Sequence, residues 1–264
     1  MRLQEIHIYP IKSLGGIRLK EAKVEIRGLQ WDRRWMLVDN NGLFMSQRTF
    51  HQMALLQVGI ESHGLKVSHK KHPKLNHYIP FEPKTDELIP VTIWEDTVIG
   101  QVVSPISNRW FSQVLGAPCQ LVFMPQNTER HIQEKYQVNN ESVSFADAMP
   151  FLLIGQKSLD DLNQKLSSPL PMNRFRPNFV VSGGKAFQED QWDRVKIGEC
   201  IFKVTKPCAR CVLTTVDQAT GIKGKEPLRT LASYRTKDKK VLFGQNMIAL
   251  ITGTIKAGDQ IQEI

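Results

Sequence analysis

Short runs of alternating apolar and polar residues, separated by turn-forming residues, fill the N-terminal part of this sequence. They read RLQEIHIYPI, LKEAKVEI, RRWMLVD, LFMSQ, ALLQVGIE and LKVSH, with turns at 40–42 (NNG) and 62–64 (SHG). A period of two bounded by turn residues is typical of half-buried strands. Strands this closely spaced predict a small barrel or sandwich.

The rest of the sequence alternates between strand-like and helix-like stretches. Residues 71–89 predict a loop with one short strand, and VTIWEDTVIGQVV predicts a hairpin that turns at Glu95-Asp96. SPISNRWFSQVLG, with Ser107 as N-cap, KSLDDLNQKL and EPLRTLASYR predict helices. NFVVSG, DRVKIG, ECIFKVTK, CVLTTVD and NMIALITG predict strands. We therefore expect a mainly β (α+β) protein, with a β-rich domain over residues 1–97 and a β-barrel with peripheral helices over residues 98–264.

Length and charge exclude several classes of protein. The 264 residues are enough for one large core or two modest ones, with two favoured. No window has the roughly 18 consecutive apolar residues of a membrane helix, and the start, MRLQEIHIYPIK, is unlike a signal peptide, so a cytoplasmic protein is expected. The charge of +9 is dispersed, which argues against a nucleic-acid-binding arm and is compatible with an anionic ligand or an acidic partner. Cys119 and Cys200 follow no regular spacing, so reduced thiols are expected.

Cys208 and Cys211 form the pair KPCARC, which fits several kinds of site. A structural zinc ion needs four ligands, and the sequence offers no second pair, only the histidines of HKKH (69–72) in a predicted loop. A thioredoxin-type redox pair begins a helix, whereas the residues that follow Cys211 are strand-like. Two interpretations stay equally supported. One is a single thiolate that binds a soft metal at the start of a strand, with Arg210 close in sequence, and the other is a pair of small buried thiols without a function.

Cations elsewhere shift this balance towards an anionic ligand. Lys12 and Ser13 follow the first predicted strand in YPIKS, Arg33 and Arg34 lie in WDRRW, and Arg176 precedes a proline in RFRPNFVV. Guanidinium and ammonium groups together are suited to binding a phosphate.

Several motifs, in this order, resemble a known family. YPIKS, DRRW, SFADAMPFLLI, RFRPNFVVSG, KPCARCVLTTVDQATG, KEPLRTLASYR and FGQNMIA follow one another as in MOSC proteins of the mitochondrial amidoxime-reducing-component type and their bacterial relatives that detoxify hydroxylaminopurine. The resemblance extends over residues 3–262, and the cysteine block is its most specific part. It implies a MOSC N-terminal β-rich domain, a MOSC β-barrel and a bound molybdenum cofactor (Mo-molybdopterin), which is a pterin dithiolene with a terminal phosphate.

The resemblance also implies roles for individual residues. Cys211 falls on the cysteine that ligates molybdenum, and Asp147 on an aspartate near the open side of the metal, where we expect it to relay a proton. The expected cofactor-binding residues are Lys12, Ser13, Arg33, Asp147, Ala148, Met149, Arg176, Ala209, Arg210, Cys211 and Asn246. Three of these depart from the mitochondrial members, which have small hydroxylated residues at Ala148 and Met149 and a tyrosine at Asn246.

The function that the resemblance implies is the reduction of N-hydroxylated compounds (amidoximes, hydroxylamines and N-hydroxylated bases) to amines or amidines. The sequence has neither a G-x-G-x-x-G motif nor an iron–sulfur cysteine set, and no fused ferredoxin domain follows the predicted barrel. We therefore expect electrons from a separate, acidic flavoprotein, ferredoxin or cytochrome. The alternative is a molybdenum-cofactor or sulfur carrier that uses a persulfide, as the C-terminal domains of cofactor sulfurases are thought to do. A basic module that binds nucleic acid is disfavoured.

Overall fold

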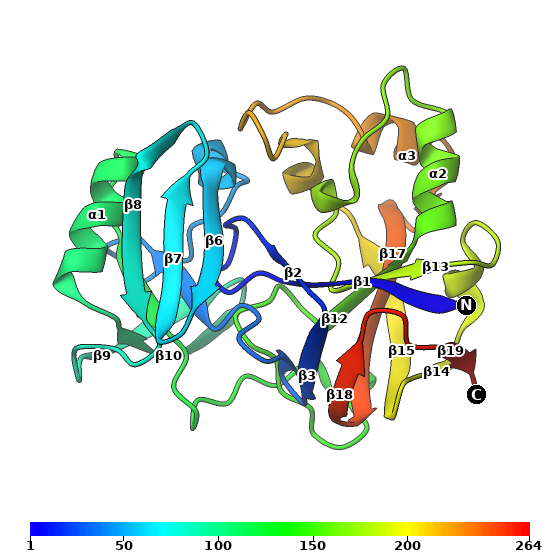
Figure 1. Cartoon of the computed structure of the whole chain (residues 1–264), viewed down its shortest axis with the longest axis horizontal. Coiled ribbons are helices and arrows are strands. Elements are labelled where there is room, and N and C mark those ends of the chain that lie inside the picture. Colours follow the sequence, from blue (N-terminus) through cyan, green and yellow to red (C-terminus); the bar gives the residue numbers. More distant parts are fainter.

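The structure, a computed structural model, describes all residues from Met1 to Ile264. Figure 1 shows two parts side by side. One, which we call the N-terminal part, contains strands β6 to β10 and helix α1, all within residues 56–115. The other, which we call the C-terminal part, contains both ends of the chain. Strands dominate both parts, which confirms the predicted mainly β class. No helix is long and apolar enough to cross a membrane.

The largest sheet has nine strands and joins the first strand of the chain to the C-terminal half. Its order is β19-β14-β15-β17-β12-β13-β1-β2, and β16 pairs with β17. The strands are β1 (Arg2–Ile8), β2 (Ile17–Leu19), β12 (Phe151–Gly155), β13 (Phe179–Ser182), β14 (Arg194–Ile197), β15 (Cys200–Ala209), β16 (Thr236–Lys237), β17 (Lys240–Ile251) and β19 (Ile261–Glu263). Only β12 and β13 are parallel, and β1 runs antiparallel to β13.

Three smaller sheets complete the β-structure. One has four strands, β5 (Trp35–Val38), β9 (Leu88–Ile93), β10 (Asp96–Val102) and β11 (Gln120–Phe123). The second is the meander of β6 (Leu56–Glu61), β7 (Gly64–His69) and β8 (His72–Pro80). The third combines β3 (Glu21–Glu25), β4 (Gly28–Leu29) and β18 (Gly253–Lys256), so it too joins distant parts of the chain.

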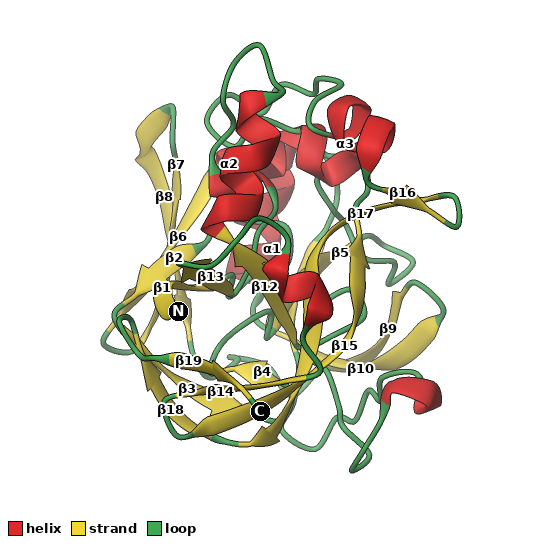
Figure 2. Cartoon of the chain, turned by 90° about the vertical axis from the view of Figure 1, so that its right-hand side faces the viewer, coloured by secondary structure: helices red, strands yellow, loops and turns green.

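Helices lie outside the sheets, as Figure 2 shows, and are α1 (Pro105–Leu115), α2 (Gln156–Gln164) and α3 (Leu228–Tyr234). The N-cap of α1 is Ser104 and not Ser107: the Ser104 side chain accepts a hydrogen bond from the backbone amide of Ser107, in the first turn of the helix. The predicted N-cap of this helix was therefore wrong by three residues, about one turn.

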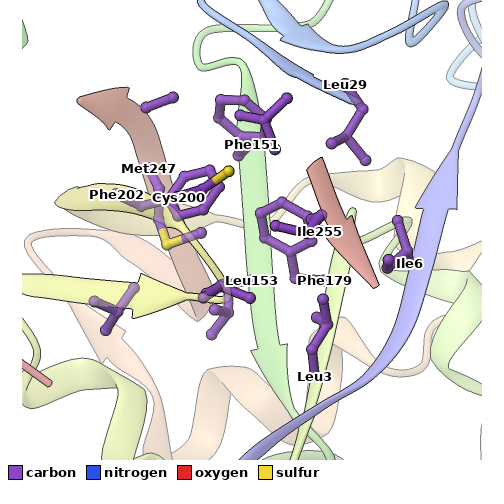
Figure 3. Packing of buried hydrophobic residues seen from close by; sticks show 14 of the residues in the cluster. Leu3, Ile6, Leu29, Phe151, Leu153, Phe179, Cys200, Phe202, Met247 and Ile255 are labelled. Carbon is purple, nitrogen blue, oxygen red and sulfur yellow. The ribbon is translucent and has the colours of Figure 1, made fainter. Parts of the chain in front are cut away.

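Each part has its own hydrophobic core. In the C-terminal part, Phe151, Phe179 and Phe202 contact one another with ring centroids 5.2–5.7 Å apart, as Figure 3 shows. These rings belong to a cluster of 19 buried residues, and a second cluster of 16 surrounds Trp35 and Phe111 in the N-terminal part. Three smaller clusters of 8, 6 and 5 buried residues complete the hydrophobic interior.

The division between residues 97 and 98 stays a prediction. Strand β10 runs through these residues, β1 pairs with β13, and β3 pairs with β18. The two predicted domains, residues 1–97 and 98–264, therefore share backbone hydrogen bonds and not only side-chain contacts.

Candidate functional site

Residues from both parts of the chain meet around Cys211. From the first 97 residues come Lys12 and Ser13 after β1, Arg33 before β5, Arg48 before the 3₁₀ helix η1 (His51–Leu55), and Trp94 in the β9–β10 turn. From the later residues come Asp147 before β12, Arg176 before β13, and Arg210 and Cys211 after β15.

Cys211 lies just beyond the end of β15 and is the residue before the 3₁₀ helix η5 (Val212–Thr215). The predicted strand over CVLTTVD was therefore wrong, and Cys211 does not lie at the start of a strand. The backbone turns here because the hydroxyls of Thr214 and Thr215 donate to the carbonyls of Cys211 and Val212, at 2.9 and 2.7 Å. The buried Arg174 fixes the turn by donating to the carbonyls of Thr214 and Thr215, both at 2.9 Å.

The two thiols of KPCARC contact different arginines. Arg48 Nε donates to Cys211 Sγ at 3.3 Å, and Arg210 Nη1 donates to Cys208 Sγ at 2.9 Å. Both cysteines are half-buried and free, and each sulfur accepts a hydrogen bond from a neighbouring guanidinium.

Lys12, Arg48 and Asp147 form what we call the aspartate cluster. Lys12 Nζ donates to Asp147 Oδ1 at 2.6 Å, and Arg48 Nη2 to Asp147 Oδ2 at 3.0 Å. The low polarity of its surroundings acts to raise the pKa of Asp147, but the two cations hold that pKa well below its usual range. Burial lowers the pKa of Lys12 to about 8, against the opposing effect of Asp147. Asp147 is therefore ionised at neutral pH, while Lys12 is close to its titration point.

The buried Arg130 fixes the backbone of Asp147. Its Nη2 donates to the Asp147 carbonyl at 3.0 Å, and its Nη1 donates to the carbonyls of Ser144 and Ala146. Its Nε donates to Asp96 Oδ2 at 2.7 Å, so one guanidinium joins the Asp147 segment to the β9–β10 hairpin.

Tyr9, Arg33 and Arg176 form what we call the arginine cluster. The guanidinium carbons of Arg33 and Arg176 lie 4.5 and 4.2 Å from the centroid of the Tyr9 ring. Arg33 is paired with Asp32 at 2.6 Å, whereas Arg176 has no carboxylate partner and its buried Nη2 has no hydrogen-bond acceptor. Burial, together with the charge of Arg33, lowers the pKa of Arg176 to about 10. A buried, unpaired guanidinium is costly unless an anion binds to it.

Backbone conformation in the arginine cluster is also unusual. Arg33 and Arg176 have φ of 51° and 55°, in the left-handed region that side-chain-bearing residues rarely adopt. Strain of this kind is common at binding sites.

The other predicted site residues have varied surroundings. Ser13 is buried and its carbonyl accepts from Gln47 at 2.6 Å, and Ala148 and Ala209 are exposed. The Met149 side chain packs in an apolar cluster with Ile248. Asn246 Nδ2 lies 3.5 Å from the carbonyl of Pro207, beside the cysteine block. Arg34, considered for phosphate binding, donates to the Met124 carbonyl instead and stays outside the site.

Arg48, Trp94 and Arg130 were not predicted. Arg48 contacts Cys211 across 163 residues of sequence, and neither SQRTF nor IWED has a local pattern that indicates a site. Only the three-dimensional structure brings Arg48 to the thiol, Trp94 to Arg48, and Arg130 to the backbone of Asp147.

A zinc site is not formed. No group of three or more His, Cys, Asp or Glu side chains lies close enough to hold a metal ion, and His69 and His72 contact each other rather than the cysteines. This removes the Cys₂His₂ alternative.

The residues present do fit a cofactor that combines a soft metal with a phosphate. A half-buried thiol beside a guanidinium suits the metal. Three arginine nitrogens, Arg48 Nη1, Arg176 Nη2 and Arg210 Nε, are buried without a hydrogen-bond partner and are available to an anion.

Comparison with known proteins identifies the family. The family described as MOSC N-terminal beta barrel domain matches residues 1–118, and the MOSC domain family matches residues 140–262. Mitochondrial amidoxime-reducing component 1 of Mus musculus is 34% identical over 97% of this chain and 80% of its own length, and the Homo sapiens protein is 32% identical over 97% and 81%. Molybdenum cofactor sulfurase of Oryza sativa is 32% identical over 92% of this chain but only 32% of its own length. The chain therefore belongs to the family of MOSC-domain proteins that includes the mitochondrial amidoxime-reducing components.

Proposed function

We propose that this protein is a molybdenum-cofactor-dependent oxidoreductase that reduces N-hydroxylated compounds to amines or amidines. The observation that carries the proposal is the unpaired, buried Arg176 guanidinium in the same site as the Cys211 thiol, the Arg48 guanidinium and the Asp147 carboxylate. Relatives named amidoxime-reducing components support the reaction class.

In this proposal the two clusters bind different ends of the cofactor. Cys211 would ligate the metal, and Arg33, Arg176 and Arg210 would hold the pterin and its phosphate. When bound, the cofactor supplies the two-electron chemistry that separates oxygen from nitrogen.

Overall, a hydroxylamine or amidoxime takes up two electrons and two protons, its N–O bond breaks, and an amine or amidine and water are formed. Asp147 was expected to relay a proton, but its low pKa makes it a poor proton donor. Lys12, with a pKa of about 8 and hydrogen-bonded to Asp147 Oδ1, is better suited to hold that proton. Asp147 then orients Lys12 and Arg48.

Electrons would come from a separate acidic protein, as the net charge of +9 favours. Lys135 and Lys206 support this, because their ammonium groups lie 5.1 and 4.3 Å from the centroid of the same Tyr136 ring and neither has a carboxylate partner. The cytoplasmic location is likewise a proposal.

A carrier of the cofactor or of sulfur is the second candidate. It is favoured by the similarity to a molybdenum cofactor sulfurase and by the 2.9 Å contact between Arg210 and Cys208, which would stabilise a reactive thiolate. A carrier would bind molybdenum without reducing any N-hydroxylated compound.

Metal and pterin analysis of protein from cells with an intact cofactor pathway tests the proposal. We expect stoichiometric molybdenum in the wild type and in Cys208→Ala, background levels in Cys211→Ala, and viologen-driven reduction of benzamidoxime wherever molybdenum is present. Equal loss of molybdenum in both variants would contradict the ligand assignment, and stoichiometric zinc would contradict the function. Molybdenum without reduction would identify the carrier.

A further inference from the structure

Trp94 is a large aromatic residue in a position that favours glycine. It is the first of two residues, Trp94 and Glu95, that connect Ile93 of β9 to its pairing partner Asp96 of β10. Its φ is 56°, in the left-handed region. Glycine is preferred at the first position of a hairpin turn with positive φ, and a bulky side chain there is strained. Strain maintained at one residue indicates that its side chain has a use.

The indole is held in the site by three contacts. The guanidinium carbon of Arg48 lies 4.3 Å from the ring, the Phe44 ring centroid lies 5.0 Å away, and the indole Nε1 donates to Asp147 Oδ1 at 3.4 Å. Arg48 also donates to Cys211 Sγ, so it lies between the indole and the thiol in this chain of contacts. The hairpin itself is anchored to the Asp147 segment through Asp96 and Arg130.

Part of the indole is open to solvent. The residue is 47% exposed although the Arg48 guanidinium lies over the ring and Phe44 packs beside it. Exposed aromatic surface beside a reaction site stacks on flat, conjugated rings.

We propose that Trp94 is a substrate-stacking residue that selects N-hydroxylated compounds whose N–O group is conjugated to a planar ring, such as aromatic amidoximes and N-hydroxylated bases. The ring of the substrate stacks on the exposed part of the indole, with its N–O group towards Asp147 and Lys12. This rests on the proposed reductase function and adds the class of substrate.

Benzamidoxime and acetamidoxime are matched probes, because they share the reacting group and differ in a phenyl against a methyl group. Their Kd values are measured calorimetrically on oxidised, cofactor-loaded protein without an electron donor, so nothing turns over, and KM and kcat are measured with reduced viologen. We expect Trp94→Ala to raise Kd and KM for benzamidoxime about tenfold and those for acetamidoxime less than twofold, and Trp94→Phe to stay within threefold of wild type. Tyr78→Ala removes an aromatic side chain of similar exposure, 44%, on β8 and should change neither probe.

Trp94→Gly separates the role of the ring from stability. Glycine accepts positive φ, so we expect its Tm to equal or exceed that of the wild type while benzamidoxime binding falls as in Trp94→Ala. If the variant bound both probes equally less tightly, Trp94 would only position Arg48 and Asp147. If the binding of neither probe changed, the substrate would not touch Trp94. Either result overturns the proposal. If the wild type binds the probes but reduces neither, the reductase function fails while the binding comparison still tests the stacking role.

Discussion

The arginine cluster and the aspartate cluster lie in one site but differ in what neutralises their cations. In the aspartate cluster, Lys12 and Arg48 meet the carboxylate of Asp147. In the arginine cluster, Asp32 neutralises Arg33 and nothing neutralises Arg176. One cluster is therefore complete in the protein alone, whereas an anionic ligand would complete the other under the proposed function.

Arg176→Met is the strongest test of this difference. Removing an unpaired buried charge should leave the free energy of unfolding of the cofactor-free protein unchanged or higher, because no carboxylate loses its partner. Cofactor retention should fall about 10- to 100-fold, the effect of losing a charge-assisted hydrogen bond to an anion. Molybdenum remaining after dialysis gives retention, and urea titration gives stability.

Arg34→Met is the matched control for that variant. Arg34 is also buried, and burial lowers its pKa to about 10 as well, but its contact is the Met124 carbonyl outside the site. Cofactor retention should be unchanged. Comparable losses in both variants would mean that any buried arginine matters and that the arginine cluster is not a ligand site.

Asp147→Asn should act in the opposite way on the free protein. It leaves Lys12 and Arg48 without their carboxylate, so we expect the free energy of unfolding to fall by about 1–2 kcal/mol. This is less than the loss expected for a fully buried ion pair, because half of the Asp147 side chain is exposed. Urea unfolding measures this change. The exposed pair Lys157–Asp160 is the control, and Asp160→Asn should cost less than about 0.5 kcal/mol. A stabilised Asp147→Asn variant would contradict the contrast between the clusters.

The pH dependence of stability gives the smallest effect. The folded pKa of Lys12 is about 8, below the value of about 10.4 in an unfolded chain. Between these values the unfolded chain holds a proton that the folded protein has released, so the free energy of unfolding rises with pH. Relative to Lys12→Met, the wild type should gain about 1 kcal/mol in its free energy of unfolding from pH 8 to 9 and almost nothing from pH 6 to 7.

The charged groups that face Lys12 are one carboxylate, Asp147, and two guanidinium groups, Arg48 and Arg130. Chemical denaturation of both proteins at each pH cancels the titration of other residues. If the free energy of unfolding of the wild type fell with rising pH relative to that of Lys12→Met, the lowered pKa of Lys12 would be contradicted.

Local sequence patterns predicted most of the fold but less of the site. Alternation along RLQEIHI and FKVTK predicted strands because pleated backbone places successive side chains on opposite faces. The same logic failed after Cys211, where a β-branched run forms a 3₁₀ turn because Thr hydroxyls and Arg174 satisfy its carbonyls.

In the site, Lys12, Arg33, Asp147, Arg176 and Cys211 were predicted through motifs. Arg48 and Trp94 were not, because each acts through contacts with residues far away in sequence, which no local pattern encodes. Whether the predicted set binds the cofactor stays a prediction.

The pairing of β1 with β13 has a consequence for when the site can form. The Tyr9 hydroxyl donates to the carbonyl of Pro177, 168 residues later, and Arg33 donates to the carbonyl of Arg176. The arginine cluster therefore does not exist until β13 has been synthesised and has joined β1, and Cys211 emerges later still. Contacts this distant in sequence form late and slowly. Under the proposed function, cofactor loading would therefore follow the synthesis of Cys211, and a loaded molecule would be one in which β1 and β13 have already paired.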